Sequence, residues 1–458
     1  MAMGAVSILG AGSGLQLQDI LDQLREVDSA PITRKEAKKV QIEDRIAEFD
    51  KIKSMLLEQK QSALTLSLTS PYLERSTTLT NSEPLSATVA AGVSTGSYNL
   101  EVVRLAQKSA WRSSQGFANS SNSVNSTGSD ETFTYEVNGE STSITVASGT
   151  SLQSMVAMIN DDPNNKGVTA RIVQDGSGAT PYKLLLQANE SGETSRINVT
   201  QQLSQLTLAE ETGSGGSSLD AEVKVDGVSY TREGNTADGI IGGVTLNLQA
   251  TGQTGLTISA STSTISDSLK DFVEKYNEFA KEYNDNNDYD MKTRVGDSLH
   301  GVSSMQTFYS QLLQDVTGNI KTGGSVTSIF DLGITLEDDG TLTLDEDTLS
   351  EALSSNFEDV KTFLLGDEDN NITGWGDTVN TRLRSATMAN GVIATERSSS
   401  EEQISQLEDQ IEAAQTRLEK KYDIMTRQFI ELDRYMSGMQ SMSNYLSQQA
   451  KSMTSSNE

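Results

Sequence analysis

The stretch Ile404-Ser405-Gln406-Leu407-Glu408-Asp409-Gln410-Ile411 begins a heptad pattern that continues to Leu446. Apolar side chains return at every seventh residue, and a second, less regular set falls between them. A 3.5-residue period keeps one stripe of a helix turned towards a partner and is typical of a left-handed coiled coil. Lys421 and Gln428 interrupt the second set. The predicted coiled-coil assembly face comprises Ile404, Leu407, Ile411, Leu418, Met425, Leu432, Met439, Met442 and Leu446.

A helical rod of this kind needs a partner. At 1.5 Å per residue it would be roughly 65 Å long. The sequence leaves three partners open: a segment of the same chain, a second copy, or a polymer. Met425, Met439 and Met442 make a pliable apolar surface that repacks easily. Together with the two polar interruptions, this favours a helix that orders in an assembly, or that a chaperone holds beforehand, over ordinary core packing.

A second helical region is predicted over residues 15–68. Its apolar residues form a short face before Pro31 and a longer face after it. Pro31 is predicted to interrupt the helix, because proline removes a backbone hydrogen bond. The predicted N-terminal helix face comprises Leu17, Ile20, Leu21, Leu24, Ile42, Ile46, Phe49, Ile52 and Leu56.

The middle of the chain, residues 76–265, has the alternating pattern of β-strands. A hairpin over 132–146 contains the favoured Asn-Gly turn, a short helix follows over 152–159, and two further strands lie between 168 and 186. These segments predict a ββαββ unit. The glycine- and serine-rich run 213–218 that follows it is typical of a flexible linker, and another hairpin is predicted around Asp226-Gly227.

The helical period returns after Ser266, so the order along the chain is helix, β, helix. This order indicates a nested insertion, and we predict an α+β multidomain protein with a discontinuous helical leg, a terminal coiled coil and inserted β-rich head domains. The predicted parts are a terminal helical and coiled-coil domain (1–40 and 400–458), a helical leg (41–75 and 266–399), a β-rich head (76–129 and 220–265) and an inserted ββαββ head (130–219).

Composition narrows the class of protein. The 458 residues include 64 acidic and 35 basic side chains, for a net charge of −29, which disfavours nucleic acid and anionic membrane as partners. No apolar run is long enough to span a bilayer, and the first residues lack the pattern of a cleaved signal peptide. The chain has no cysteine, which suits either a reducing cytosol or export in an unfolded state.

The sequence offers little for catalysis. The glycine-rich run 10–14 superficially resembles a dinucleotide fingerprint, but Leu15 stands where its third glycine belongs. His300 is the single histidine, and the acidic loop around Gly340 has Thr335 where a calcium loop needs Asp. We therefore predict a protein that is not an enzyme, with no catalytic residue, no metal site and no cofactor.

Several segments, taken in order, resemble the bacterial flagellar filament cap family, also called hook-associated protein 2. Ser-Gly-Leu-Gln at 13–16 is similar to the family's opening Ser-Gly-Leu-Asp, with Gln16 in place of the usual Asp. The ββαββ unit resembles a module that flagellin and hook proteins share. Further segments that follow the family order are 96–107, 225–228, 243–246, 272–277, 332–334, 340–345 and 352–353.

This resemblance implies a structural cap at the distal end of the flagellar filament, which retains exported flagellin and promotes its folding and polymerisation. It implies secretion through the flagellar export channel and an extracellular location at the tip. The implied partners are further copies in a ring, flagellin, the hook–filament junction proteins and an export chaperone at the C-terminal helix. An alternative remains, in which loops such as 119–130 make the β-rich heads an adhesin for host mucin.

Overall fold

The computed structural model describes residues 16–176, 178–290 and 295–454. The glycine-rich run 10–14 lies outside these residues. The described chain forms two compact units: a helical unit that takes in the residues up to Leu68 and from Thr264 onward, and a β unit over Thr69–Ser263. The β unit is therefore inserted between the two halves of the helical unit. This confirms the predicted α+β multidomain fold with a discontinuous helical part, while the finer four-part division stays a prediction.

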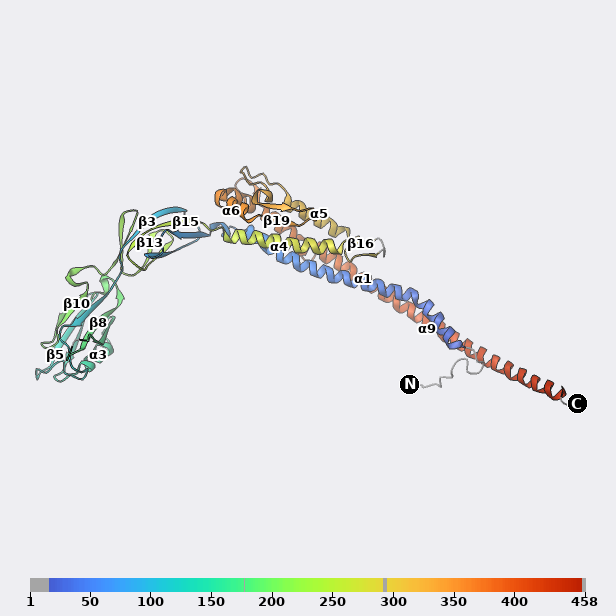
Figure 1. Cartoon of the computed structure of the whole chain (residues 1–458), viewed down its shortest axis with the longest axis horizontal. Coiled ribbons are helices and arrows are strands. Elements are labelled where there is room, and N and C mark those ends of the chain that lie inside the picture. The colour runs from blue at the N-terminus through green and yellow to red at the C-terminus, as the bar shows by residue number, and fades with distance from the viewer. Residues whose placement is uncertain (1–15, 177, 291–294, 455–458) are drawn as a thin grey trace. The chain divides into compact units, whose positions relative to one another are not determined.

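The helical unit is built on long helices at both ends of its sequence, coloured blue and red in Figure 1. Short two-stranded ladders and a 3₁₀ turn connect the helices between them. Its helices are α1 (Leu17–Leu66), α4 (Ser263–Asn286), α5 (Ser303–Thr317), α6 (Glu346–Ser355), α7 (Phe357–Leu365), α8 (Trp375–Thr387) and α9 (Val392–Thr454).

Aromatic side chains fill the core of the helical unit. Phe272, Tyr276, Phe279 and Tyr283 recur along one face of α4 and are all buried, as their helical spacing predicts. The ring of Trp375 meets that of Phe272 edge-on, with centroids 4.8 Å apart, the arrangement that aromatic quadrupoles favour. This face of α4 therefore anchors the later helices.

Pro31 does not interrupt the first helix, and the predicted break at this position is wrong. It lies inside α1, which runs without a break from Leu17 to Leu66. Proline removes one backbone hydrogen bond, to the carbonyl four residues earlier. That carbonyl belongs to Val27, which is 72% exposed, so solvent is accessible as a replacement donor. Packing of α1 along α8 and α9 outweighs the local cost.

The β unit contains two subdomains, each with its own hydrophobic core. The base subdomain has a five-stranded sheet in the order β1-β15-β3-β11-β12 and a three-stranded sheet in the order β13-β14-β2. Its strands are β1 (Arg75–Leu79), β2 (Leu85–Val89), β3 (Gly96–Arg104), β11 (Ala221–Val225), β12 (Val228–Arg232), β13 (Thr236–Ile241), β14 (Val244–Leu248) and β15 (Gly252–Ala260).

The inserted subdomain contains the predicted ββαββ unit. It has a four-stranded sheet in the order β10-β4-β8-β7 and a three-stranded sheet in the order β6-β5-β9. Because β4 pairs with β8 and β10, this sheet takes in residues ahead of the predicted start at 130. Its elements are β4 (Lys108–Ser113), β5 (Glu131–Val137), β6 (Glu140–Val146), α3 (Leu152–Asp161), β7 (Val168–Gln174), β8 (Tyr182–Ser191), β9 (Asn198–Gln201) and β10 (Leu208–Thr212).

Two hairpin turns depend on left-handed backbone conformations. Asn138 and Gly139 join β5 to β6 with φ of 52° and 75°, and Asp226 and Gly227 join β11 to β12 with φ of 48° and 85°. Two consecutive positive φ angles match the right-handed twist of the flanking strands, and Asn-Gly and Asp-Gly adopt them at low cost. Both turns occur where the sequence predicts them.

Across the described residues, no helix combines the length with the apolar character that crossing a lipid bilayer requires.

Candidate assembly surface on the terminal helices

Helices α1 and α9 lie side by side and run in opposite directions (Figure 1). Three ion pairs fix their register. Asp50 pairs with Arg397 at 3.1 Å and Lys39 with Glu408 at 2.7 Å, and Asp28 pairs with Lys421. The α9 numbers rise as the α1 numbers fall, so the helices are antiparallel. Of the three possible partners of the heptad helix, the structure provides a segment of the same chain for its first part.

The predicted assembly face of α9 divides into a paired and an unpaired part. In the paired part Leu407 is buried, while Ile404, Ile411, Leu418 and Met425 are half-buried against α1. In the unpaired part all four predicted residues are exposed among the described residues: Leu432, Met439, Met442 and Leu446. The same heptad pattern is therefore packed against α1 in one part of α9 and exposed to solvent in the other.

The predicted face of α1 divides in a similar way. Its buried members are Leu17, Leu21, Ile42, Phe49, Ile52 and Leu56, and Ile46 is half-buried. Ile20 and Leu24 are instead 46% and 42% exposed, and Val27 beside them is 72% exposed. These three residues are spaced four and then three positions apart, so they form one stripe on the surface of α1.

Tyr422 is a residue of the α1–α9 contact that the heptad pattern does not predict. Counting by sevens places Lys421 in the seam, but Tyr422 occupies it and is only 4% exposed. Its hydroxyl donates a hydrogen bond of 2.7 Å to Asp28, and Lys421 donates to the same carboxylate oxygen. The guanidinium of Arg25 lies 5.9 Å from the centre of the tyrosine ring. The signal that could have identified Tyr422 in place of Lys421 is an aromatic ring in the heptad helix together with an aspartate on the facing helix.

Two pKa values reflect this contact. The hydrogen bond from Lys421, followed by that from Tyr422, holds the pKa of Asp28 below its usual range. Burial, followed by the hydrogen bond to Asp28, raises the pKa of the Tyr422 phenol to about 12. The phenol is therefore a neutral donor and the carboxyl a charged acceptor over the whole physiological range.

The part of α9 beyond the pair carries an exposed apolar stripe and a long stretch without charged residues. If the register continues, Leu17 at the start of α1 falls opposite about residue 433, and α9 extends a further ~30 Å to Thr454. No Asp, Glu, Lys, Arg or His occurs between 435 and 450, in a chain with a net charge of −29. The exposed apolar residues here, which we call the terminal stripe, are Leu432, Tyr435, Met436, Met439, Met442, Tyr445 and Leu446. A continuous exposed apolar stripe of this kind marks an interaction surface.

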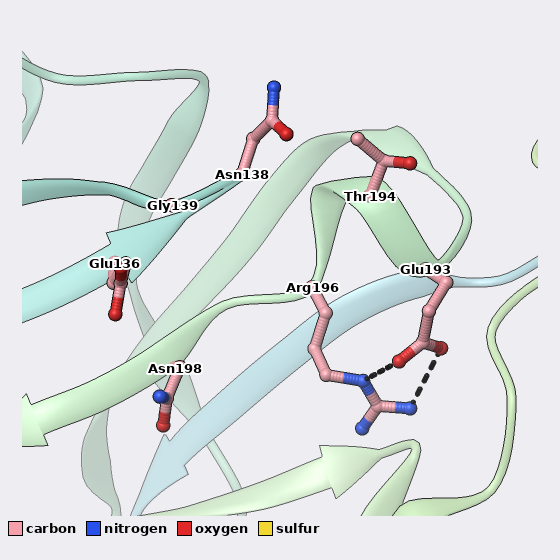
Figure 2. Close-up of a pocket in the computed structure, with 7 residues that line it drawn as sticks. All are labelled: Glu136, Asn138, Gly139, Glu193, Thr194, Arg196 and Asn198. Carbon is pink, nitrogen blue, oxygen red and sulfur yellow. Dashed lines mark hydrogen bonds and ion pairs between the residues drawn. The ribbon is translucent and has the colours of Figure 1, made fainter.

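A different kind of surface occurs in the inserted subdomain. A polar concavity of about 430 Å³ is lined there by the residues shown in Figure 2. Its cation, Arg196, is bonded to the carboxylate of Glu193, and the remaining lining residues are Glu136, Asn138, Gly139, Thr194 and Asn198. The lining contains neither an imidazole nor an aromatic ring on which a sugar could stack. Among the residues that the structure describes, no three His, Cys, Asp or Glu side chains are grouped to hold a metal ion.

Comparisons with known proteins all point to the same protein family. Sequence models of the N-terminus and the C-terminus of flagellar hook-associated protein 2 match residues 13–109 and 218–441. A model of the flagellin hook IN motif matches residues 132–190, inside the inserted subdomain. The two end models thus match in order on either side of the insertion.

Individual proteins agree with the family models. Flagellar hook-associated protein 2 of Escherichia coli K12 is 26% identical, over 99% of this chain and 100% of its own length. That of Campylobacter jejuni is also 26% identical, over 82% of this chain, and this chain spans 66% of its length.

A solved structure supports the fold. The crystal structure of the D1-D2-D3 domains of the flagellar cap protein FliD from Escherichia coli aligns with a TM-score of 0.50 at 24% identity. The alignment covers 77% of this chain and 99% of that one. From the ordered match of both end models and the full-length relatives, the chain belongs to the flagellar hook-associated protein 2 family.

Proposed function

We propose that this protein is a structural cap at the distal, extracellular end of the bacterial flagellar filament. There it retains exported flagellin and promotes its folding and polymerisation. Family membership supports this role, and the relative with the solved structure is a flagellar cap protein. The observation that carries the proposal for this chain is the uncharged terminal stripe at the end of the antiparallel helix pair.

The geometry of the stripe suits a helical partner. Leu432, Met439 and Leu446 recur at every seventh residue, so an amphipathic helix can lie along them. The exposed stripe of Ile20, Leu24 and Val27 lies in the first turns of α1, towards the same end of the pair. The partner helices are the helical termini of flagellin and the matching helices of further copies in a ring.

The same stripe needs a cover before assembly. A long apolar surface on a free chain invites aggregation. An export chaperone that binds the C-terminal helix would cover the terminal stripe and release it at the filament tip. Methionine suits this exchange, because its flexible thioether side chain packs against more than one surface. The hook–filament junction proteins are the partners on which the first ring assembles.

The proposed role is non-enzymatic and needs no cofactor, in keeping with a family of structural cap proteins. The adhesin alternative receives no support from the family. The concavity in the inserted subdomain also lacks the aromatic platform that a mucin-binding site would use. We therefore retain capping as the one proposed function.

The test places charge on the terminal stripe while leaving the helix intact. Methionine and lysine have similar helix propensity, so the double variant Met439→Lys/Met442→Lys keeps α9 helical. In cells that lack their own cap protein, we expect it to give short or absent filaments and monomeric flagellin in the medium. Ile424→Lys is the matched control, because Ile424 is also exposed on α9 but lies outside the stripe.

Cells that carry the double variant and grow full-length filaments without shedding flagellin would overturn the proposal. Deleting residues 404–458 is a second test, which should abolish capping and leave the β unit folded.

A further inference from the structure

The connection between the base and inserted subdomains contains a side chain that nothing in the proposed function uses. The chain leaves the base subdomain after Arg104 and returns through the glycine- and serine-rich run 213–218. The composition of this run predicts a flexible linker. The structure instead gives a short turn, η2 (Ser214–Gly216), in which Gly215 has a left-handed conformation and whose flanks are held by a side chain from the inserted subdomain.

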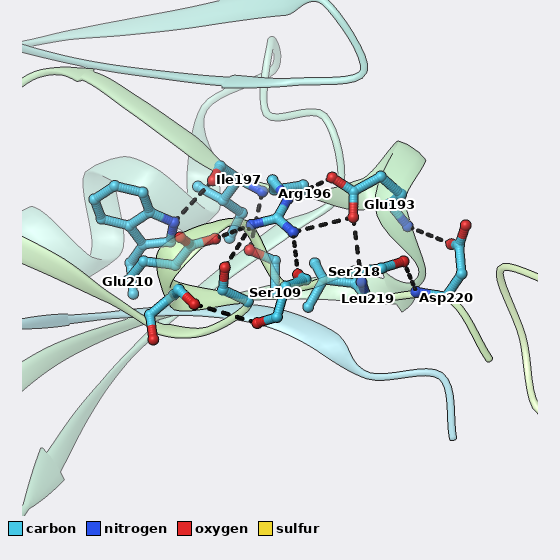
Figure 3. A network of polar contacts seen from close by, with 12 residues as sticks. Ser109, Glu193, Arg196, Ile197, Glu210, Ser218, Leu219 and Asp220 are labelled. Carbon is cyan, nitrogen blue, oxygen red and sulfur yellow. Dashed lines mark hydrogen bonds and ion pairs between the residues drawn. The ribbon is translucent and has the colours of Figure 1, made fainter. Parts of the chain in front are cut away.

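That side chain is Arg196, and every one of its donors is engaged (Figure 3). Arginine has five N–H donors in a fixed planar arrangement. Nε and Nη2 bond the two oxygens of Glu193 at 2.7 and 3.0 Å. Nη1 bonds the carboxylate of Glu210 and, at 3.0 Å, the carbonyl of Gly213. Nη2 also bonds the carbonyl of Ser217 at 2.6 Å. The guanidinium thus bonds the residues on both sides of η2.

Glu193 extends the same network to the end of the return segment. Its carboxylate accepts a hydrogen bond of 3.2 Å from the backbone N–H of Leu219. Its own N–H donates to the carboxylate of Asp220 at 2.7 Å. The hydrogen bond from Arg196, its strongest influence, holds the pKa of Glu193 below its usual range. The pair therefore stays charged at neutral pH, and the bonds it makes are charge-assisted.

Gly213 shows how closely the segment fits around the guanidinium. Its φ is 86°, and a Cβ added there would lie 2.7 Å from Nη1 of Arg196. Gly215, two residues on, has a φ of 73° but meets nothing within 4 Å. Both glycines are needed for their backbone conformation. Only Gly213 is also needed for the close approach of the arginine.

We infer that Arg196 is a latch that holds the return segment, residues 213–219, and thereby fixes the inserted subdomain on the base subdomain. When Arg196 makes these bonds, the latch is closed and residues 213–219 are an ordered connection. With the latch open, the run becomes the flexible linker that its composition predicts, and the inserted subdomain is held less rigidly on the base subdomain. This inference does not depend on the capping role.

The experiment uses the full chain and exploits its lack of cysteine. Cysteines introduced at Ser141 on β6 and Ser229 on β12, both exposed, carry one spin label in each subdomain. Double electron–electron resonance should give one narrow distance distribution for the parent and a broad one for Arg196→Gln. Hydrogen exchange of the amides 213–219 should accelerate roughly tenfold or more, because hydrogen bonds to a charged group are lost.

The matched control is Arg112→Gln. Arg112 on β4 forms an ion pair with Glu211 on β10, and neither residue belongs to the return segment. We expect the parental distance distribution and exchange rates for this variant. A narrow distribution and slow exchange in Arg196→Gln, as in the control, would overturn the latch.

A second pair of variants keeps the test decisive if Arg196→Gln fails to fold. Gly213→Ala and Gly215→Ala impose the same left-handed conformation on alanine, but only Gly213→Ala presses a methyl group on the guanidinium. The latch requires a broader distance distribution for Gly213→Ala than for Gly215→Ala. Equal distributions would contradict it.

Discussion

The hydroxyl of Tyr422 donates a hydrogen bond of 2.7 Å to the carboxylate of Asp28, across the antiparallel pair of α1 and α9. Lys421 donates to the same oxygen, so a single carboxylate joins two neighbouring residues of α9 to α1. This contact lies near the end of the paired part, just before the terminal stripe. We expect this contact to determine how far along their length α1 and α9 stay paired.

Tyr422→Phe removes only the hydroxyl and should fray the end of the helix pair. The ring still fills its site, but Asp28 keeps one donor in place of two. We expect faster hydrogen exchange in α1 between Leu17 and Asp28, and a small fall in the unfolding temperature of the helical unit. Tyr435→Phe is the control, since Tyr435 is 66% exposed. Unchanged exchange in α1 would show that the hydrogen bond does not hold the pair.

Asp28→Asn should destabilise the helical unit in a pH-dependent way. The pKa of Asp28 is lowered from its ordinary value of 3.8 by the bond from Lys421. A depressed carboxyl pKa contributes stability above the unfolded value, and this contribution is lost as pH falls through the folded value. Denaturant unfolding should therefore separate the parent from the variant at pH 7 and bring them together at pH 2. A gap that persists at pH 2 would contradict this assignment.

Glu48→Gln should stabilise the helical unit at alkaline pH. Burial, followed by the nearby carboxylate of Glu282, raises the pKa of Glu48 to about 7, against the opposing charge of Lys51. One of its carboxyl oxygens is buried without a hydrogen-bond partner among the described residues. A raised carboxyl pKa gives stability that is complete below the unfolded value of 4.5 and lost as pH rises through about 7.

For Glu48→Gln, the unfolding temperature should exceed that of the parent at pH 8 and match it near pH 5. Asp44→Asn provides the control, because Asp44 is exposed on the same helix. Equal unfolding temperatures for Glu48→Gln and the parent at pH 8 would refute the proposed cost of the buried charge.

Pro31→Ala should stabilise α1, because the proline lies in a helix interior. Proline is about 3 kcal/mol less favourable than alanine at such a position. Alanine restores the N–H that can bond the carbonyl of Val27, so we expect a gain of about 1–3 kcal/mol in the free energy of unfolding. Pro71→Ala should bring no gain, since Pro71 stands at the start of α2 (Ser70–Leu73), where proline is favoured. Loss of stability in Pro31→Ala would show that the proline serves a bend that α9 requires.

The elements that the sequence predicts well are those with strong local signals. The hairpin turns at Asn138-Gly139 and Asp226-Gly227 need positive φ angles that few other residues adopt, so the turn dipeptide determines them. Asp345 precedes a helical pattern as a cap should, and its side chain accepts a hydrogen bond from the N–H of Thr348 at the start of α6. In each case the cause lies within a few residues of its effect.

The features that the sequence does not predict depend on distant partners. Heptad spacing predicts that α9 has an assembly face, but it cannot show where α1 ends and the terminal stripe begins. The shift from Lys421 to Tyr422 follows from Asp28 on the facing helix. The ordered conformation at Gly213 involves Arg196 in the same way. The local composition of the run gives no sign of this arginine.

The insertion of the β unit has a consequence for how the chain folds as it emerges. Asp28 and Tyr422 are 394 positions apart, and the whole β unit lies between them. A chain that leaves a ribosome or a narrow channel amino end first exposes α1 long before α9 is available. The strands of the β unit find their partners within their own segment and fold early, whereas α1 waits for a long-range contact. Closure of the terminal helix pair therefore comes after the β unit can fold, because Tyr422 must emerge before it can meet Asp28.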